Sequence, residues 1–506
     1  MTELFEIRID ASEAPPGEAA RLLHESLRTA ILDGRLAPGA KLPPARHAKN
    51  YFGVSRNTLA EVYDRLLNEG LVLTRQGAGT YVAQFRTPPV QLTSRPDSPP
   101  SHALLAEHHL NAFWQRPDVR RAIGFWQDEP CGEQHRERWA PRPDSIDFRP
   151  ALVDARQFPM EIFRRVSAKQ LRDLERRPRN NQSPLGNQGN RGLRRAITQH
   201  VAVTRAVVAT DAEVLVTAGA QQAFDILARA LVRRGITVVA IEDPGYPPMR
   251  VAFAAAGARL FPVPVDNEGL RVDRLPNDVR IICVCPSHQF PLGTAMSSRR
   301  RRQLIERASE LQAVIVEDDY DGEFRYDDGP LEALRTDENA ANVFYVGTFS
   351  KCMLPALRLG FIIGPPWAMA ALIATKNCLD WHCSTPIQLS VAQFIDEGHL
   401  AHHVRKMRDI YGQRRRLILK ALDQELGRWL QPVVSTYGMH ITVLTESSID
   451  TEQVAQNLRQ RGVEIHTLRR YFYGAAYRTG LVLGFGATDL DEIKTGLLKL
   501  KQVLDT

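Results

Sequence analysis

The chain has 506 residues, which is too long for one ordinary core and predicts two or three domains. Hydrophobic residues make up 43% and charged residues 24%, a balance that excludes a mainly disordered, collagenous or coiled-coil protein. The net charge of +7 is concentrated between residues 91 and 205, where it fits either an anionic partner such as DNA or an arginine-rich solvated surface.

Two further features indicate the compartment. No apolar run approaches the ~18 residues that cross a bilayer, so we expect no contact with a membrane. The six cysteines are too few for a disulfide scaffold, and neither Cys283 and Cys285 nor Cys378 and Cys383 have the paired spacing of a zinc site. We therefore expect reduced thiols, no metal and a cytoplasmic location.

The first predicted helix covers residues 20–34. Its apolar positions recur with helical spacing, as at Leu23, Leu27 and Ile31. A turn rich in proline and glycine leads to a short helix over 44–52. These elements begin a compact N-terminal unit.

The next predicted helix covers residues 54–70 and begins at Ser55, a good N-cap residue. Its first turn carries the side chains that a helix-turn-helix places in the major groove, Arg56, Asn57 and Thr58. Two short strands then follow within 71–83, around a glycine-rich turn with Gln76 and Gly77. This order of elements predicts a winged helix-turn-helix domain over residues 1–83.

A change of composition marks a connector after this domain. Residues 87–100 are rich in proline and serine, which is typical of a linker. Trp114, Trp126 and Trp139 indicate that the later part packs against something. We expect a partly ordered linker over 84–145.

From residue 146 onward, apolar strand-like runs alternate with helical patterns. This alternation predicts an α/β domain over 146–506 with a mostly parallel sheet covered on both faces. The clearest predicted strands are 213–218, 237–243, 280–286, 313–319 and 342–349.

Polar side chains follow five of these strands, at the sheet edge where open α/β folds bind ligands. Each residue alone is as easily an ordinary surface or packing residue. The set comprises a turn into a helix at Ala220 and Gln221, the aromatic Tyr246, the polar turn at His288 and Gln289, the pair Asp318 and Tyr320, and Lys351 with Ser350 before it and Arg358 after it.

Pyridoxal phosphate needs this inventory. A lysine forms a Schiff base with the cofactor, and a carboxylate keeps its pyridine nitrogen protonated. An arginine and the backbone N–H groups of a helix N-terminus hold its phosphate. An aromatic side chain stacks on the ring.

The N-terminal motifs LRTAILDGRLAPGAKLP, GVSRNTLAEVYDRLLNEG and QGAGTYV resemble the winged helix of GntR-type bacterial regulators. Two positions depart from that family's usual residues: Lys49, which lies near the expected DNA backbone, and Pro44. The resemblance implies DNA contacts by Arg46, Ser55, Arg56, Asn57, Thr58, Gln76 and Gly77.

The later motifs TAGAQQA, EDPGY, PSHQFPLG, EDDYDGEF and GTFSK resemble fold type I aminotransferases, in the spelling of the MocR-like subfamily of GntR regulators. The resemblance implies that Lys351 holds pyridoxal phosphate covalently and that Asp318 pairs with the ring nitrogen. It implies that Tyr320 bonds the ring hydroxyl and Tyr246 stacks on the ring. It implies that the phosphate is held by Arg358, Ser350, Thr348, Ala220 and Gln221.

Two departures from active aminotransferases lie at the other end of this expected site. The usual asparagine of the third turn is Phe290, so the contact with the ring hydroxyl passes to His288 or Gln289, or is lost. The late strand that usually carries a carboxylate-binding arginine, residues 481–486, has no basic residue. Arg470 and Arg478 are the candidates to bind an effector in its place.

The sequence therefore predicts a multidomain cytoplasmic transcription regulator that binds double-stranded operator DNA and pyridoxal phosphate. We expect it to sense pyridoxal phosphate, or an amino compound that reacts with the bound cofactor, and the resemblance implies a homodimer. The alternative is an active aminotransferase that carries a DNA-binding head. A third interpretation, a DNA-binding protein that has lost the cofactor, is disfavoured because Lys351, Asp318 and Arg358 are all present.

Overall fold

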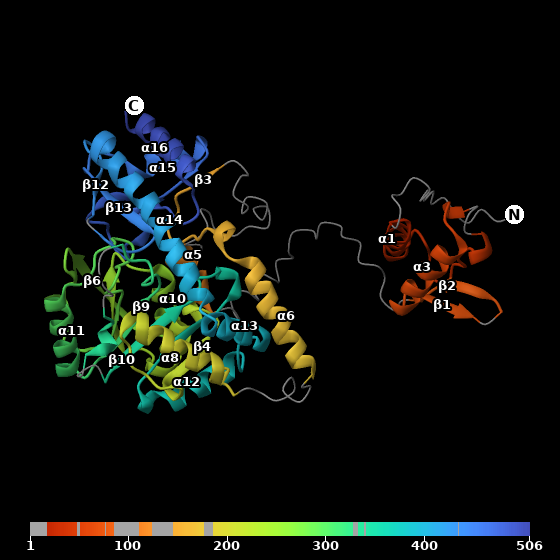
Figure 1. The fold of residues 1–506 in the computed structure, drawn as a ribbon, viewed down its shortest axis with the longest axis horizontal. Helices are drawn as coiled ribbons and strands as arrows, with labels where there is room; N and C mark the ends of the chain where they lie inside the picture. Colours follow the sequence, from red (N-terminus) through yellow and green to blue (C-terminus); the bar gives the residue numbers. More distant parts are fainter. Residues whose placement is uncertain are drawn as a thin grey trace. The chain divides into compact units, whose positions relative to one another are not determined.

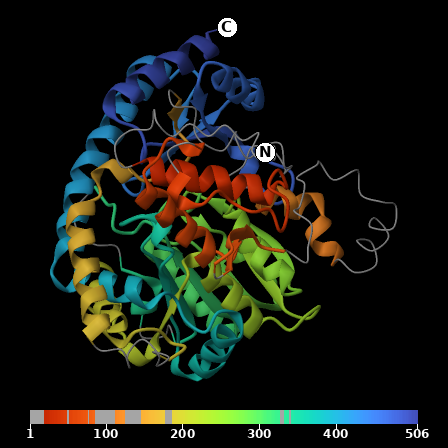
Figure 2. The ribbon, with the colours of Figure 1, turned by 90° about the vertical axis from the view of Figure 1, so that its right-hand side faces the viewer.

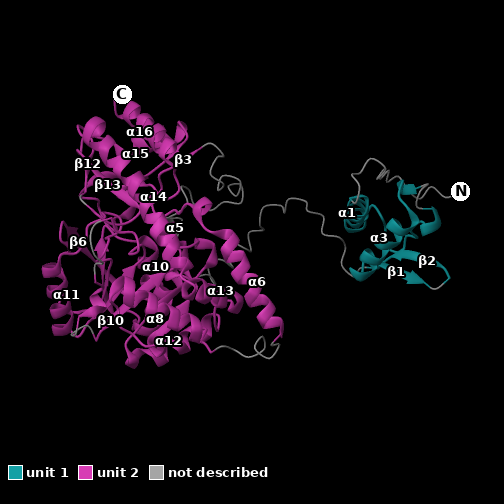
Figure 3. Cartoon of the chain, viewed as in Figure 1, with its two compact units in different colours: residues 1–110 teal, residues 111–506 magenta. Residues whose placement is uncertain are grey.

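The computed structural model divides the chain into two compact units, residues 1–110 and 111–506 (Figure 3). The predicted boundaries near residues 83 and 145 remain predictions. Lys49, Gln76, Trp126 and Trp139 lie outside the described residues. The structure describes residues 18–47, 51–75, 77–84, 111–123, 145–176, 186–326, 332–337, 341–433 and 435–505.

The N-terminal unit is a helical core with a β-hairpin. Two helices bury their apolar faces against each other, and the hairpin strands complete this core. The predicted first helix, the helix that begins after Ser55 and the wing are confirmed. Of the short helix expected over 44–52, the described residues are a 3₁₀ turn at 45–47 and helical residues at 51–52. The elements are α1 (Ala19–Leu32), η1 (Ala45–His47), α3 (Arg56–Asn68), β1 (Val72–Arg75) and β2 (Gly79–Val82).

The larger unit contains an eight-stranded sheet, and it is mostly parallel as expected. Only β11 and β7 run antiparallel to their neighbours, so the strands that the sequence predicted share one direction. Their carboxyl ends therefore meet at one edge. In spatial order the strands are β4 (Val214–Thr217), β11 (Gly360–Ile363), β10 (Val343–Thr348), β9 (Val314–Asp319), β8 (Val279–Val284), β5 (Val238–Asp243), β6 (Arg259–Asp266) and β7 (Gly269–Leu270).

Helices cover both faces of this sheet (Figures 1 and 2). Alternate residues of β10 show the division: Phe344 and Val346 pack with α9, α10 and α12, while Val343 and Tyr345 belong to the clusters on the opposite face, with α8, α11 and α13. Such burial on both faces accounts for the nearly continuous apolar strands. The helices are α8 (Arg191–Arg205), α9 (Ala220–Leu231), α10 (Pro247–Ala255), α11 (Ser298–Glu310), α12 (Pro366–Leu379) and α13 (Thr385–Asp396), and α6 (Met160–Arg176) packs on α13.

A long helix, α14 (His399–Ala421), leads into a smaller four-stranded sheet. Helix α15 (Thr451–Gln460) packs against strands of this sheet, and α16 (Leu490–Leu504) packs against α14 and α15. None of the helices in the described part of the chain is both long and apolar enough to cross a membrane. The strands of the smaller sheet, in spatial order, are β12 (Gln431–Pro432), β13 (His440–Thr445), β16 (Thr479–Gly484) and β15 (His466–Thr467).

Part of the connector belongs to the larger unit. A 3₁₀ turn, η2 (Ala112–Gln115), is followed by the short helix α5 (Pro117–Ile123), which packs against α10. Val119 of α5 is buried, whereas Trp114 is half exposed. Trp114 is the one described residue among the three tryptophans that we expected to pack. The buried contact of this segment comes from Val119 instead.

Candidate functional site

The start of α3 carries the predicted DNA-contacting residues. The hydroxyl of Ser55 accepts a hydrogen bond from the backbone N–H of Thr58 (3.1 Å), so Ser55 is the N-cap that the sequence indicated. Arg56 and Asn57 follow on the exposed surface of the first turn. Ser55 and Thr58 therefore shape the helix end, while Arg56 and Asn57 are the side chains free to reach a base.

The hairpin and the turn at η1 add further basic groups. Arg46 is exposed on η1, and Gly77 lies in the hairpin turn with a φ of 75°. Arg75 and Lys41 both lie over the ring of Tyr81, at 5.0 and 5.7 Å from its centroid. Lys41 was not predictable from its local sequence, because its pairing with the wing arises from a β-bridge between Lys41 and Tyr81.

In the larger unit, the turn between β4 and α9 is shaped to hold an anion. Gly219 takes a φ of 84°, a conformation that favours glycine, and no side chain caps the helix that starts at Ala220. A guanidinium N–H of Arg358 donates to the carbonyl of Ala218 (2.9 Å), and a Cβ at Gly219 would lie only 3.2 Å from that guanidinium. Uncapped N–H groups and an adjacent arginine are the chemistry of a phosphate site.

Other predicted phosphate contacts lie at the end of β10. The hydroxyls of Thr348 and Ser350 are joined by a hydrogen bond of 3.0 Å, and the Ser350 N–H donates to the Thr348 hydroxyl (3.2 Å). β10 is adjacent to β11, which pairs in turn with β4. By contrast, the Gln221 side chain donates outward to the carbonyl of Pro248 (3.1 Å) and is exposed, so Gln221 offers its backbone N–H rather than its amide.

Asp318, at the end of β9, is a buried carboxylate whose two oxygens differ in their hydrogen bonding. Its Oδ2 accepts a weak hydrogen bond from the Cys285 thiol (3.6 Å), whereas its buried Oδ1 has no hydrogen-bond partner among the described residues. Burial, with a further contribution from the charge of Asp319, raises the pKa of Asp318 to about 7. A buried acceptor without a partner is costly, so Oδ1 fits an N–H donor from a ligand such as a protonated pyridine.

Lys351 follows β10 and lies within electrostatic range of these acids. Burial lowers the pKa of Lys351 to about 8, although the charges of Asp321 and Asp318 oppose the shift. Its Nζ donates to the carbonyl of Ala151 (2.5 Å), a contact from the start of the larger unit that the sequence did not indicate. A lysine with a lowered pKa is more often neutral, and only the neutral amine reacts with an aldehyde.

Tyr320 is joined to a buried histidine. Its hydroxyl lies 2.7 Å from Nδ1 of His288, and Asp321 lies 3.0 Å from the same nitrogen. The Nε2 atom of His288 is buried without a hydrogen-bond partner among the described residues. Gln289 is already committed, since its amide nitrogen donates to Glu242 and to the carbonyl of Pro244. Of the two candidates for the ring hydroxyl, His288 therefore lies against the Tyr320 hydroxyl, whereas the Gln289 side chain bonds to the loop around it.

Phe290 packs against two residues that we predict to contact the cofactor. Its ring meets Tyr246 edge-to-face at 5.7 Å and Tyr320 at 5.6 Å. Phe290 is buried, and it extends the aromatic cluster to Tyr471. The position that carries a polar amide in aminotransferases here contributes packing and no hydrogen bond from its side chain.

The two candidate effector arginines flank the loop that leads into β16. An Nη1 of Arg470 lies 3.3 Å from Nε2 of His466, and Arg478 lies over the ring of Tyr477 at 5.7 Å. The same loop is tied to the edge of the site, because Asp243 accepts a hydrogen bond from the Tyr473 N–H (2.8 Å).

Comparison with known proteins places both parts of the chain in families. Residues 157–481 match the family of class I and II aminotransferases, and residues 20–82 match the gntR family of bacterial regulatory proteins. The chain is 32% identical to the probable rhizopine catabolism regulatory protein MocR of Rhizobium meliloti, over 95% of this chain and 92% of that one. It is 26% identical to the pyridoxine biosynthesis transcriptional regulator PdxR of Corynebacterium glutamicum, over 99% of both chains.

Solved structures show the same fold. The kynurenine aminotransferase of Pyrococcus horikoshii, in a crystal structure with PMP, is 25% identical and superimposes with a TM-score of 0.67 over 74% of this chain and 95% of that one. Fold, site and matches together define a winged-helix DNA-binding domain fused to a fold type I aminotransferase-like domain that binds pyridoxal phosphate. The chain belongs to the MocR-like subfamily of GntR-type transcription regulators. When bound, the cofactor supplies a reactive aldehyde and an electron-accepting ring.

Proposed function

We propose that this pyridoxal phosphate-dependent regulator senses the cofactor itself, or a small amino compound that reacts with the bound cofactor, and that the outcome changes its binding to operator DNA. The observation that carries the proposal is the buried Oδ1 of Asp318, which has no hydrogen-bond partner among the residues that the structure describes. This oxygen can accept a hydrogen bond from the ring N–H of the cofactor, and it belongs to the same chain as the winged helix. Because operators are chromosomal, the protein works in the cytoplasm.

In this proposal Lys351 binds the cofactor covalently, Asp318 pairs with the ring nitrogen and Tyr246 stacks on the ring. Tyr320 bonds the ring hydroxyl, with His288 holding the tyrosine hydroxyl in place. Arg470 and Arg478 are the candidates for the carboxylate of an effector. The phosphate is held by Arg358, Thr348, Ser350 and the N–H groups of Ala220 and Gln221, and DNA is contacted by Arg46, Ser55, Arg56, Asn57, Thr58, Gln76 and Gly77.

The second candidate function is an active aminotransferase with a DNA-binding head. One observation favours it: the pKa of Lys351 is lowered to about 8, as a residue that must exchange protons near neutral pH requires. The aromatic replacement at Phe290 favours the regulator.

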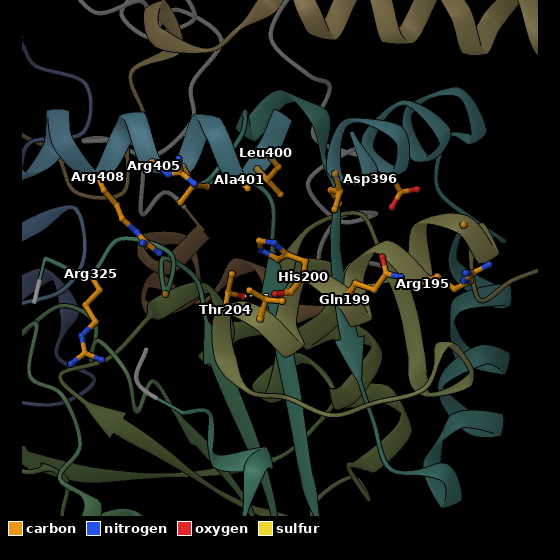
Figure 4. A pocket seen from close by; sticks show the side chains of 15 residues that line it. Arg195, Gln199, His200, Thr204, Arg325, Asp396, Leu400, Ala401, Arg405 and Arg408 are labelled. Carbon is orange, nitrogen blue, oxygen red and sulfur yellow. Dashed lines mark hydrogen bonds between the residues drawn. The ribbon is translucent and has the colours of Figure 1, made fainter. Parts of the chain in front are cut away.

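We propose that the protein works as a homodimer in which a second copy covers a groove beside the site. This groove encloses about 900 Å³ between α8, the start of α14 and the residues that follow Asp321 (Figure 4). Val203 on its wall is 82% exposed, and its rim carries both arginines, such as Arg405, and the acidic Asp396. An exposed apolar residue with charges of both signs around it suits a self-complementary interface.

The dimer is tested by sedimentation of the wild-type protein and the variant Val203→Glu. We expect a dimer for the wild type and a shift towards monomer for the variant, because the change replaces an apolar contact with a charged side chain that must lose its water on burial. A wild-type monomer at micromolar concentration would remove the proposal.

The sensing function is tested with DNA selected from a random-sequence library by the holoprotein. Affinity for that DNA is measured for the apoprotein, for the protein loaded with pyridoxal phosphate, and for the loaded protein with added amino acids. A change of at least about 5-fold between two of these states is expected for coupling between two sites. Equal affinity in every state contradicts the proposal.

A further inference from the structure

Lys376, near the end of α12, is completely buried, with 0% of its surface exposed. Its ammonium pairs with the carboxylate of Asp380, one turn further along the chain, and donates to Oε1 of Gln222 (3.0 Å) and towards the thiol of Cys383 (3.6 Å). Burial of a lysine is unfavourable without such partners. The sequence analysis assigned no role to it.

The partner Gln222 lies in the first turn of α9, three residues after Gly219. Its Oε1 also accepts the backbone N–H of Ala218 (2.7 Å), and its Nε2 donates to Oδ2 of Asp380 (2.9 Å). Lys376 and Asp380 thus bind the two ends of one amide group, which fixes its orientation. With the amide fixed, the position of the Ala218 N–H is fixed as well.

The peptide held in this way is part of the turn that we assign to the phosphate. The carbonyl of Ala218 accepts the hydrogen bond from Arg358 (2.9 Å), on the other side of the same residue. The Thr217 hydroxyl donates to the carbonyl of Gly219 (3.0 Å). Lys376 is therefore two hydrogen bonds away from the backbone that presents the uncapped N–H groups of α9.

We propose that Lys376 is a positioning residue for the phosphate group of the cofactor, acting through Gln222 on the turn at Ala218 and Gly219. The inference rests on the proposed phosphate role of that turn. Lys376 orients the amide, the amide orients the turn, and the turn and Arg358 then meet the phosphate in the required geometry.

The experiment compares equilibrium binding of pyridoxal phosphate and pyridoxal to the full-length apoprotein, because pyridoxal lacks only the phosphate. For Lys376→Met we expect affinity for pyridoxal phosphate to fall about tenfold, as for loss of a hydrogen bond that involves a charged group. Affinity for pyridoxal should change less than about twofold. Cys383→Ala is the matched control, since it removes a contact of Lys376 without touching Gln222, and should leave both affinities unchanged.

Two outcomes overturn the inference. Affinities for both ligands that fall together indicate a general structural role, and an unchanged affinity for pyridoxal phosphate indicates no role. A double-mutant cycle of Lys376→Met, Gln222→Met and the double variant tests the route: the two single effects should not add if Lys376 acts through Gln222, and additive effects contradict it. The quantity compared in the cycle is the ratio of the affinities for pyridoxal phosphate and pyridoxal, and not the free energy of unfolding.

Arg358→Ala separates this inference from the proposal beneath it. If Arg358→Ala lowers the preference for pyridoxal phosphate over pyridoxal and Lys376→Met does not, the phosphate site stands and only the role of Lys376 is wrong. If Arg358→Ala leaves the preference unchanged, the phosphate site itself is wrong and the inference falls with it.

Discussion

The two ends of the candidate site differ in how much of an aminotransferase they retain. At the cofactor end, Lys351 has a lowered pKa, and Arg358 donates to the turn before α9. Within the described part of the chain, one oxygen of Asp318 has no hydrogen-bond partner and no side chain caps α9. At the opposite end, Phe290 stands where aminotransferases use a polar amide, and Arg470 lies against His466. The groups that would hold the cofactor are present, whereas the polar amide typical of aminotransferases is absent at position 290, and this contrast fits the proposed sensor.

The largest expected effect comes from the cofactor end. Lys351→Ala should abolish covalent attachment completely, because a primary amine is needed to condense with the aldehyde. Borohydride reduction followed by peptide mass mapping checks this, with Asp318→Asn as the control that keeps the lysine. Trapping of the cofactor on another lysine in the wild-type protein would contradict the assignment.

In the N-terminal unit, Arg56→Ala should weaken binding to selected DNA by about 1–3 kcal/mol, or roughly 5- to 150-fold, if Arg56 reads a base. Arg65, at the other end of α3 and paired with Glu61, is the matched control, and Arg65→Ala should have little effect. Fluorescence anisotropy titrations at one salt concentration measure both. Equal losses for the two variants would show that α3 does not read DNA through its first turn.

The pH dependence of cofactor attachment follows from the pKa of Lys351. Because this pKa lies near 8, the neutral fraction of the amine, and with it the rate of attachment to the apoprotein, should rise about tenfold between pH 7 and pH 9 and level off above. A lysine at its ordinary pKa of 10.4 would instead give a rise of about 100-fold without a plateau. Stopped-flow absorbance distinguishes the two profiles.

The smallest effect is expected in the connector. Val119→Asp should release α5 from α10, because it places a carboxylate in a buried apolar contact. Binding of the cofactor and of DNA should each stay within about twofold, while the change in DNA affinity on cofactor binding disappears. Val119→Ile serves as the control that keeps the contact, and a full response in the Val119→Asp protein would show that coupling does not pass through α5.

Much of the fold followed from the sequence because its patterns are local. The predicted strands of the large sheet, the helix that begins after Ser55 and the hairpin wing all reflect periodicity and turn residues within short segments. The candidate site was accessible for a similar reason, since parallel strands bring residues such as Asp318 and Lys351 to one edge.

Contacts that depend on tertiary packing were not predictable in this way. Ala151 lies 200 positions before Lys351, with which it shares a hydrogen bond, and Lys376 lies 154 positions after Gln222. The role of Gln289 as a brace depends on Glu242 from another strand. Asp321 could have been found from the sequence, because it directly follows Tyr320. Both residues lie against the same nitrogen of His288.

Turnover is the measurement that tests the contrast between the two ends most directly. The holoprotein, with covalently bound cofactor verified by reduction, is incubated with a panel of amino donors and 2-oxoglutarate, and glutamate is quantified over many cofactor equivalents. We expect no sustained formation of glutamate, and at most about one equivalent per site. Steady-state turnover at about 10 s⁻¹, a typical enzymatic rate, would contradict it and make the chain an aminotransferase with a DNA-binding head.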